Sequence, residues 1–419
     1  MALTRVIDLG EQYLQGSFIK PGKENPPLRQ IPTQLLRCDP TRDEKACGLL
    51  QMATSVPPMV LYSSYWYRSG TNQTMRDHLR GIAEDATQLV QGGSRRVLDI
   101  GCNDGTLLRY YPSAFEKFGV DPSDVAQEIG SGVTVVQDTF PSYELKSLMG
   151  NQEFDIITSI AMFYDLEDPV GFVKEIKTLL RDDGLWIFEM SYMPSMLAMN
   201  SYDTICHEHL EYYSLAVLEN LLGRCGMKVF RVETNGINGG SIRCYATHNT
   251  NFKFKSWDNA KSLEQLRREE FDLELDTDKP YRHFQDRINH HKQELSMLLN
   301  GLKREGKTIH VYGASTKGNT ILQWCGIDHT LIDYAADRNP GKDGAKTIGT
   351  DIPIISEEKS RAMNPDYYLV LPWHFRAEFL QRERPLIDKG VGFIFPLPQI
   401  EIVGKGSGAT ILRRYLPAA

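Results

Sequence analysis

The fold is decided by the stretch Val97-Leu98-Asp99-Ile100-Gly101-Cys102-Asn103-Asp104-Gly105-Thr106-Leu107-Leu108. It predicts a buried strand, a turn with two glycines and the start of a helix. The glycines let the backbone pass close to a ligand, and a helix N-terminus offers N–H groups to an anion. Asp121 follows Gly101 by 20 residues, at the tip of the next expected strand. A carboxylate there can accept hydrogen bonds from ribose hydroxyls, so the stretch predicts a nucleoside-binding turn.

The glycine spacing distinguishes between two nucleoside ligands. A dinucleotide fingerprint requires G-x-G-x-x-G, whereas three residues separate Gly101 from Gly105. Asp99, before the first glycine, can hold the amino group of S-adenosylmethionine, and D-x-G-x-N-D-G resembles motif I of methyltransferases. A tight turn without a ligand is the alternative. Residues 136–140 fall where such enzymes contact adenine. The contacts to the cofactor expected from these two stretches are Asp99, Gly101, Asn103, Gly105, Leu107, Asp121, Asp138 and Phe140.

Short apolar runs alternate with helical patterns along the rest of the chain. The expected helices cover 77–91, 170–180 and 215–225, with another between the second and third strands. Residues 257–303 favour helix, and Pro280 is expected to divide them into two. The expected strands cover 96–100, 117–120, 133–136, 154–160, 185–189, 228–233, 241–247, 309–312, 330–334, 367–370 and 392–395.

This alternation predicts an α/β fold with largely parallel sheets. We expect a Rossmann-like domain of the class I S-adenosylmethionine methyltransferase type, a small irregular N-terminal unit, and a second, C-terminal α/β domain that is also Rossmann-like. The expected boundaries are 1–72 for the N-terminal unit, 73–255 for the methyltransferase domain, 256–303 for a helical bridge and 304–419 for the C-terminal domain.

The composition argues against several classes of protein. The 419 residues are 41% hydrophobic and 24% charged, as in a globular protein of two or three domains. The net charge of −7 disfavours nucleic-acid binding, and no apolar run approaches the roughly 18 residues of a membrane span. A signal-peptide pattern is missing at the N-terminus, and the seven dispersed cysteines are typical of reduced thiols. We expect a cytoplasmic enzyme, a monomer or small homo-oligomer, that binds neither nucleic acid nor membrane.

Residues 202–213 are rich in titratable side chains, with His207-Glu208-His209 at their centre. In an extended segment the two histidines would share one face. H-E-H does not match the H-E-x-x-H of helical metal sites, so a metal is a minor alternative, and a loop of satisfied polar residues is another. We favour acid/base chemistry, because a histidine can take a proton from a carbon that a neighbouring carbonyl acidifies. A tyrosine hydroxyl can stabilise the resulting enolate.

Five motifs together resemble one family, the nucleotide-sugar C-methyltransferases, which methylate C3 of 4-keto-deoxysugars attached to a nucleoside diphosphate. They occur in the family's order and span nearly the whole chain. The matching pieces are Tyr65-Trp66-Tyr67-Arg68-Ser69-Gly70-Thr71-Asn72, the D-I-G-C-N-D-G turn, the H-E-H segment, Asn238-Gly239-Gly240-Ser241-Ile242-Arg243 and Gly313-Ala314-Ser315-Thr316-Lys317-Gly318-Asn319.

The resemblance implies that His209 is the base that removes the C3 proton, with Glu208 and His207 in the same segment. It also implies that hydroxyl groups of the 65–67 region reach over the ligands, Tyr65 beside the cofactor and Tyr67 among the catalytic groups.

Two departures from the family concern the catalytic groups. Cys206 stands where some members carry a tyrosine, and residues 159–165 lack a histidine that some members carry after the fourth strand. Tyr164 is expected to supply the hydroxyl instead.

The second glycine turn, 313–318, is interpreted as a surface for the diphosphate of the substrate, with Lys317 facing phosphate. An equal alternative is that the C-terminal domain only supports the first domain and binds no ligand. Residues 238–243 can likewise be explained as a plain hairpin turn. The expected substrate contacts are Asn238, Gly240, Ser241, Arg243 and Lys317.

The family usually begins with a four-cysteine zinc module, but here only Cys38 and Cys47 are present. The N-terminal unit is interpreted as a truncated, zinc-module-like unit. Two thiolates rarely hold structural zinc, so two reduced thiols near a turn are favoured and zinc stays a weaker alternative.

Two other functions compete with C-methylation. One is methylation of oxygen or nitrogen in a small molecule or sugar, for which His209 could equally serve as the base. The other is a dinucleotide-dependent sugar oxidoreductase, although the turn at 313–318 matches that fingerprint poorly.

Overall fold

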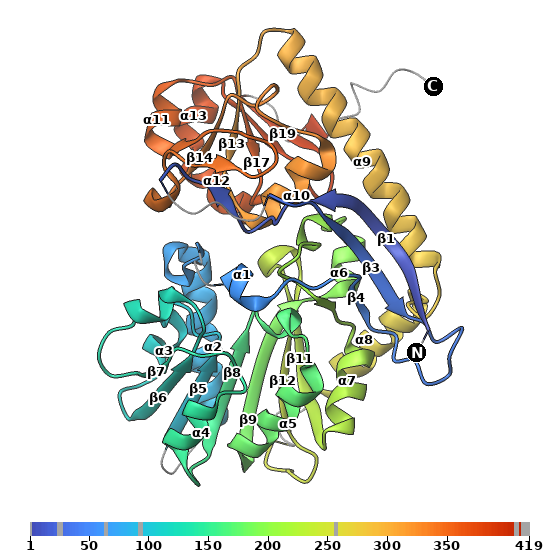
Figure 1. Ribbon diagram of the computed structural model, residues 1–419, viewed down its shortest axis with the longest axis vertical. Coiled ribbons are helices and arrows are strands. Elements are labelled where there is room, and N and C mark those ends of the chain that lie inside the picture. Colours follow the sequence, from blue (N-terminus) through green and yellow to red (C-terminus); the bar gives the residue numbers. More distant parts are fainter. Residues whose placement is uncertain are drawn as a thin grey trace.

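The computed structural model describes residues 2–22, 28–62, 66–90, 95–254, 259–405 and 410–411. Figure 1 shows two α/β bodies, a lower one in blue to yellow-green and an upper one in orange to red. The N-terminal strands and the long helix α9 run beside them and connect the two bodies. No helix in this part of the chain is long and apolar enough to cross a membrane.

The first sheet has seven strands within these residues, in the order β11-β12-β9-β8-β5-β6-β7. The run from β9 to β7 is parallel, and β12 and β11 are antiparallel. Because β5 has β6 on one side and β8 on the other, a ligand crevice is expected at its carboxyl end. The bounds are β5 Arg95–Ile100, β6 Phe115–Val120, β7 Thr134–Val136, β8 Phe154–Ile160, β9 Leu180–Ser191, β11 Met227–Asn235 and β12 Ser241–His248.

Helices cover both faces of this sheet. Adjacent residues of a strand point to opposite faces, so Val97 belongs to one core with Ile82 of α2, and Leu98 to another with Ile176 of α5. Asn72 begins α2 by accepting the N–H of Thr74. The bounds are α1 Pro58–Tyr62, α2 Gln73–Leu89, α3 Thr106–Tyr110, α4 Tyr143–Met149, α5 Pro169–Leu179, α6 Met193–Ala198 and α7 Leu215–Arg224.

The second sheet repeats the parallel arrangement, in the order β16-β14-β13-β17-β18-β19-β20. Its strands are β13 Ile309–Tyr312, β14 Tyr334–Asp337, β16 Ile354–Ser356, β17 Tyr367–Val370, β18 Gly392–Phe395, β19 Glu401–Val403 and β20 Thr410–Ile411. Its helices are α10 Thr316–Cys325, α11 Glu357–Ala362, α12 Arg376–Arg382 and α13 Arg384–Lys389. Two helices lead to it from the first sheet, α8 Ala260–Asp272 and α9 Lys279–Arg304.

The N-terminal unit is more regular than expected. Strands β1 Leu3–Gln12, β3 Ile31–Cys38 and β4 Leu50–Met52 form an antiparallel sheet that β10 Glu211–Tyr212 completes. The short strand β2 Phe18–Ile19 pairs with β15 Lys346–Thr347 of the C-terminal part. The prolines and glycines of this unit concealed the strands, and β10 comes from a distant part of the chain.

The α/β class is confirmed, and several strands have the expected bounds, among them 154–160 and 309–312. Two expectations were wrong. Only a 3-10 helix, Asp124–Glu128, lies between β6 and β7, and the strand expected at 330–334 begins at Tyr334. Pro280 lies in the first turn of α9, where its missing N–H costs nothing.

Cys38 and Cys47 lie together, since the Cys47 N–H donates to Cys38 Sγ at 3.4 Å. The described residues, which include every cysteine and histidine of the chain, contain no group of three side chains that could hold a metal ion. Structural zinc is held by four ligands. These residues therefore do not fit a structural zinc ion.

A buried ion pair lies next to these cysteines. Arg37 is 0% exposed, and its Nη2 donates to Asp39 at 3.0 Å and to Asp278, just before α9, at 2.7 Å. The hydroxyls of Thr4 and Thr41 donate to Asp39 and lower its pKa to about 2. Arg37 thus connects the N-terminal sheet to α9 through charge.

Asp39→Ala is expected to lower the free energy of unfolding by about 3 kcal/mol at pH 7, because Arg37 stays buried with one partner fewer. The folded pKa of Asp39 is depressed, so its stabilisation is present above about pH 4 and is lost as the pH falls toward 2. Urea denaturation at pH 7 and about pH 3 measures the difference, which must shrink at the lower pH. An equal difference at both values would contradict this role.

Chelation is expected to leave the fold intact. After treatment with EDTA the protein should keep its melting temperature, and metal analysis of the untreated protein should give substoichiometric zinc. One zinc ion per chain, removed by EDTA with a fall in melting temperature, would overturn this conclusion.

Candidate functional site

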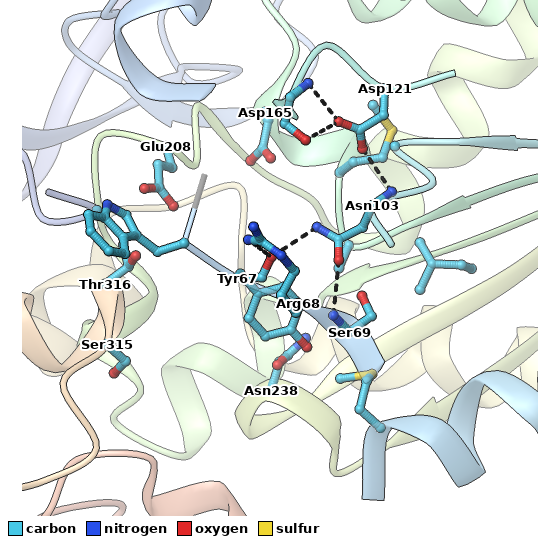
Figure 2. A pocket seen from close by; sticks show the side chains of 18 of the residues that line it. Tyr67, Arg68, Ser69, Asn103, Asp121, Asp165, Glu208, Asn238, Ser315 and Thr316 are labelled. Atoms are coloured by element: carbon cyan, nitrogen blue, oxygen red, sulfur yellow. Dashed lines mark hydrogen bonds between the residues drawn. The ribbon is translucent and has the colours of Figure 1, made fainter. Parts of the chain in front are cut away.

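A cavity of about 660 Å³ lies at the carboxyl ends of β5 and β6 and extends to the second sheet. Its walls come from the turn after β5, residues 66–72, the H-E-H segment and the turn after β13. Figure 2 shows Asn103 and Asp121 on one side of it and Glu208 and Thr316 on the other. Segments far apart in the sequence therefore meet in one space.

The turn after β5 depends on Gly101 and Gly105, which both have a φ of 71°. Such values suit glycine, and a Cβ on Gly101 would lie 3.0 Å from Met162 Cγ. The N–H of Gly101 donates to Val120 of β6 at 2.8 Å. Gly101 and Leu107 line the cavity, whereas Gly105 shapes the start of α3 and does not line it.

Asp121 and Asp99 supply the two carboxylates of this half of the cavity. Asp121 Oδ2 accepts the N–H of Asn103 at 2.8 Å, and Oδ1 accepts from Ser123. A carboxylate has about four acceptor positions, so Asp121 can also accept from ribose hydroxyls. Asp99 is buried and accepts the Thr158 hydroxyl at 2.6 Å, and burial raises its pKa to about 7.

These groups fit S-adenosylmethionine. The cationic amino group of that molecule would supply the countercharge for Asp99, and Gly101 exposes bare backbone to the cavity. Asp138 and Phe140, predicted to contact the cofactor, line the same cavity. Tyr65, also expected at the cofactor, lies outside the described residues.

The H-E-H segment is a turn and not an extended strand, because the His209 N–H donates to Cys206 O at 3.0 Å. The expected common face of His207 and His209 was therefore wrong. Glu208 and His209 line the cavity, but His207 does not. His207 lies 2.7 Å from Gln15 Oε1 through Nδ1, and burial lowers its pKa to about 4.

His209 is held in one tautomer. Its Nδ1 lies 2.7 Å from the carbonyl oxygen of Thr204, which can only accept, so Nδ1 carries the proton and Nε2 has the lone pair. Its ring lies 4.3 Å from the Tyr164 ring, centroid to centroid. Burial and the charge of Lys317 lower the pKa of His209 to about 3, so the ring is neutral at neutral pH.

Glu208 lies beside the N-terminal unit. Burial raises its pKa to about 7, and the hydroxyl of Thr316 opposes that rise. A Cβ on Gly16 would overlap the Glu208 carboxylate as it lies here, so a larger residue would force that carboxylate to move.

The turn after β13 repeats the bonding of the first turn. Gly313, with a φ of 85°, donates to Ala336 of β14 at 2.8 Å, and Ala314 N–H donates to Asp337 Oδ2 at 2.9 Å. Lys317 Nζ donates to Asn238 O at 2.8 Å, and burial lowers the pKa of Lys317. All four of Ala314, Lys317, Asp337 and Asn238 line the cavity.

Three expected substrate contacts do not line the cavity: Gly240, Ser241 and Arg243. Arg243 is buried, and its Nε donates to Glu189 at 2.8 Å. Ser241 donates its hydroxyl to Ile237 O at 2.9 Å. Tyr67, Tyr164, Lys317 and Asn238, for which catalytic or substrate-binding roles are predicted, do line the cavity.

Sequence reasoning missed His374 and Gly16, which also line the cavity. Burial and Lys317 lower the pKa of His374 to about 3. The sequence could have indicated His374, because it lies just beyond β17, at the carboxyl end of a parallel strand, where ligands bind. Gly16 gave none, because its role depends on a contact with Glu208 nearly two hundred residues away.

Three family models match the chain in succession. The models describe a putative zinc binding domain at residues 1–62, a methyltransferase domain at 71–232 and a C-methyltransferase C-terminal domain at 236–398. Together they cover most of the chain. The zinc model matches a region whose residues do not fit structural zinc.

Relatives agree with these matches. C-methyltransferase NovU of Streptomyces niveus is 27% identical over 411 residues, which cover 96% of this chain and 94% of that protein. Malonyl-[acyl-carrier protein] O-methyltransferase of Porphyromonas gingivalis is 26% identical over 33% of this chain and 52% of that protein. Magnesium protoporphyrin IX methyltransferase from Synechocystis, solved with S-adenosylhomocysteine, is 12% identical, with a TM-score of 0.34 over 42% of this chain and 88% of that chain.

The full-length relative and the C-terminal model both name transfer to carbon, and the first sheet carries the turn and carboxylates that fit the methyl donor. The chain is an S-adenosylmethionine-dependent methyltransferase whose residues 236–398 match the C-terminal domain of C-methyltransferases.

Proposed function

We propose that the chain methylates C3 of a 4-keto-deoxysugar attached to a nucleoside diphosphate. The observation that carries this proposal is that the cofactor turn, His209 and a second glycine turn line one cavity. A carbon acceptor needs a base beside the methyl donor, and a nucleotide-linked acceptor needs a second nucleoside site within reach.

The second glycine turn supports a nucleotide on the acceptor. Asp337 accepts from Ala314 as Asp121 accepts from Asn103, which is the arrangement that suits a ribose. Lys317 adds a cation at the same turn. In this proposal Asp337 holds the nucleoside of the substrate and Lys317 faces its diphosphate.

His209 removes the proton in this mechanism. Its neutral Nε2 accepts the proton from C3, and the electron pair of the C–H bond forms the C3–C4 double bond while the C4 oxygen becomes negative. Nδ1–H stays bonded to Thr204 and stabilises the imidazolium that forms. Without a ligand, the pKa of His209 is low, which would make His209 a weak base. The negative charge of the bound substrate would raise this pKa and so make His209 a stronger base.

Lys317 and Tyr164 are proposed to stabilise the enolate. Lys317 interacts electrostatically with His209, and the ring of Tyr164 packs against the His209 ring. In this proposal Lys317 and Tyr164 therefore lie near the carbon that His209 deprotonates. A cation and a hydroxyl in a site shielded from water stabilise developing negative charge strongly. Glu208, whose pKa is about 7, can hold or release a proton beside them.

Asp99 and Asp121 would hold the amino group and the ribose of S-adenosylmethionine. When bound, that cofactor supplies an electrophilic methyl group to the carbon that His209 has deprotonated. Tyr67 forms part of the wall of the same space.

Nucleotide-linked 4-keto-deoxysugars, assayed as a panel with S-adenosylmethionine, should yield one methylated product whose new methyl group survives acid hydrolysis. With that acceptor, His209→Ala should abolish exchange of the C3 proton in deuterium oxide and still bind S-adenosylhomocysteine. His207→Gln, on the same turn but outside the cavity wall, is the matched control and should retain exchange. Unchanged exchange in His209→Ala would exclude His209 as the base, and a methyl group lost on hydrolysis with O-demethylating reagents would exclude transfer to carbon.

Binding of S-adenosylhomocysteine is expected to strengthen as the pH rises through about 7 and to level off above. Asp99 is protonated below its raised pKa, and only the ionised form attracts the ligand's ammonium group. Calorimetric titration between about pH 5.5 and 8.5 measures the effect. Asp99→Asn should bind weakly at every pH and lose the dependence, and a dependence that persists in this variant would assign it to another group.

A further inference from the structure

Residues Trp66–Gly70, called the strap here, cross the cavity between the two α/β bodies. Tyr67, Arg68 and Ser69 line the cavity together with the cofactor turn. Trp66 O accepts from the side chain of Asn339, beyond β14, at 3.0 Å. The other end of the strap continues into α2 of the first body. The strap therefore touches both bodies.

Asn103 binds the strap with both ends of its amide. Its Oδ1 accepts the Ser69 N–H at 2.9 Å, and its Nδ2 donates to Tyr67 O at 3.2 Å. Figure 2 shows these two bonds and the bond from the Asn103 backbone to Asp121. One residue of the cofactor turn thus joins the strap to the carboxylate at the tip of β6.

The conformation of the turn does not by itself require asparagine. Asn103 has a φ of 50°, which glycine adopts at no cost. The strap has two further ties: Gly70 N–H donates to Asp104 at 2.8 Å, and Arg68 forms an exposed ion pair with Glu128 at 2.8 Å. The exposed ion pair contributes little, so the buried Asn103 amide, with its two hydrogen bonds, is a stronger restraint than that pair. The Gly70 bond holds the far end of the strap, whereas the two Asn103 bonds hold Tyr67 and Ser69 themselves.

We propose that Asn103 is a positioning residue: its side chain holds the strap over the cofactor turn, so that Tyr67 and Ser69 form a fixed wall of the cofactor site. The proposal rests on cofactor binding and not on the identity of the acceptor. The wall costs no ordering entropy when the cofactor binds, because Asn103 has ordered it beforehand.

Asn103→Gly distinguishes this role from a conformational one. If only the positive φ matters, the variant binds S-adenosylhomocysteine as well as the wild type or better. If the amide positions the strap, we expect about 10-fold weaker binding by calorimetry and faster hydrogen exchange at Ser69 and Gly70. Asn364→Gly is the matched control, because Asn364 has a φ of 49° and lies outside the cavity wall. It should leave the affinity unchanged.

Ser69→Pro tests the same bond from the other side. Proline removes the N–H that donates to Asn103 and also the Ser69 hydroxyl, which interacts with the Tyr67 side chain. Ser69→Ala removes the hydroxyl alone and is the baseline for the comparison. Arg68, before the proline, is already extended, with φ −132° and ψ 118°. We expect the affinity to fall about as much as in Asn103→Gly, and the double variant to lose little more. Asn103→Asp, which keeps the acceptor for Ser69, should recover part of the affinity.

Thermal unfolding followed by circular dichroism shows whether each variant is folded. If Asn103→Gly does not fold, Ser69→Pro and Asn103→Asp decide the question. Wild-type affinity in Ser69→Pro, or fully additive losses in the double variant, would overturn the proposal.

Discussion

A carboxylate at the tip of one strand accepts a backbone N–H from the glycine turn of the neighbouring strand, and the site depends on this interaction. It occurs twice, as Asp121 with Asn103 at 2.8 Å and as Asp337 with Ala314 at 2.9 Å. Each bond adds to the backbone bonds that already hold its turn to the neighbouring strand, and each carboxylate keeps further acceptor positions. Because both turns line the same space, the two sheets present similarly bonded turns to one cavity.

The sequence predicted what local chemistry determines. The turn from Gly101 to Gly105, the strand at 154–160 and the α/β class follow from glycine positions and apolar runs, and the structure contains them. The orientation of His207 depends on a bond within the turn and on Gln15, far away in the sequence. Arg243 looked like a ligand contact because its partner, Glu189, lies on a neighbouring strand that no local pattern connects to it.

The N-terminal unit shows how a family resemblance and the residues present can diverge. A zinc-binding model matches residues 1–62, yet only two cysteines lie together there. Arg37, buried between Asp39 and Asp278, joins the same region to α9. Buried charges that lose a partner destabilise a fold strongly, so such a network can make a connection specific, as a metal ion does. Sequence patterns could not reveal it, because Asp278 is 241 residues from Arg37.

Gly16 has a consequence for the way this chain can be divided or recombined. The missing Cβ of Gly16 makes room for the Glu208 carboxylate, and the side chain of Thr316 interacts with that carboxylate. Three regions of the chain thus contribute atoms to one contact. A fragment cut at a domain boundary, or a chimera that takes one region from a relative, would carry an intact Rossmann-like fold and a mismatched wall. A change in one of the three regions is therefore expected to move the Glu208 carboxylate unless the other two change with it.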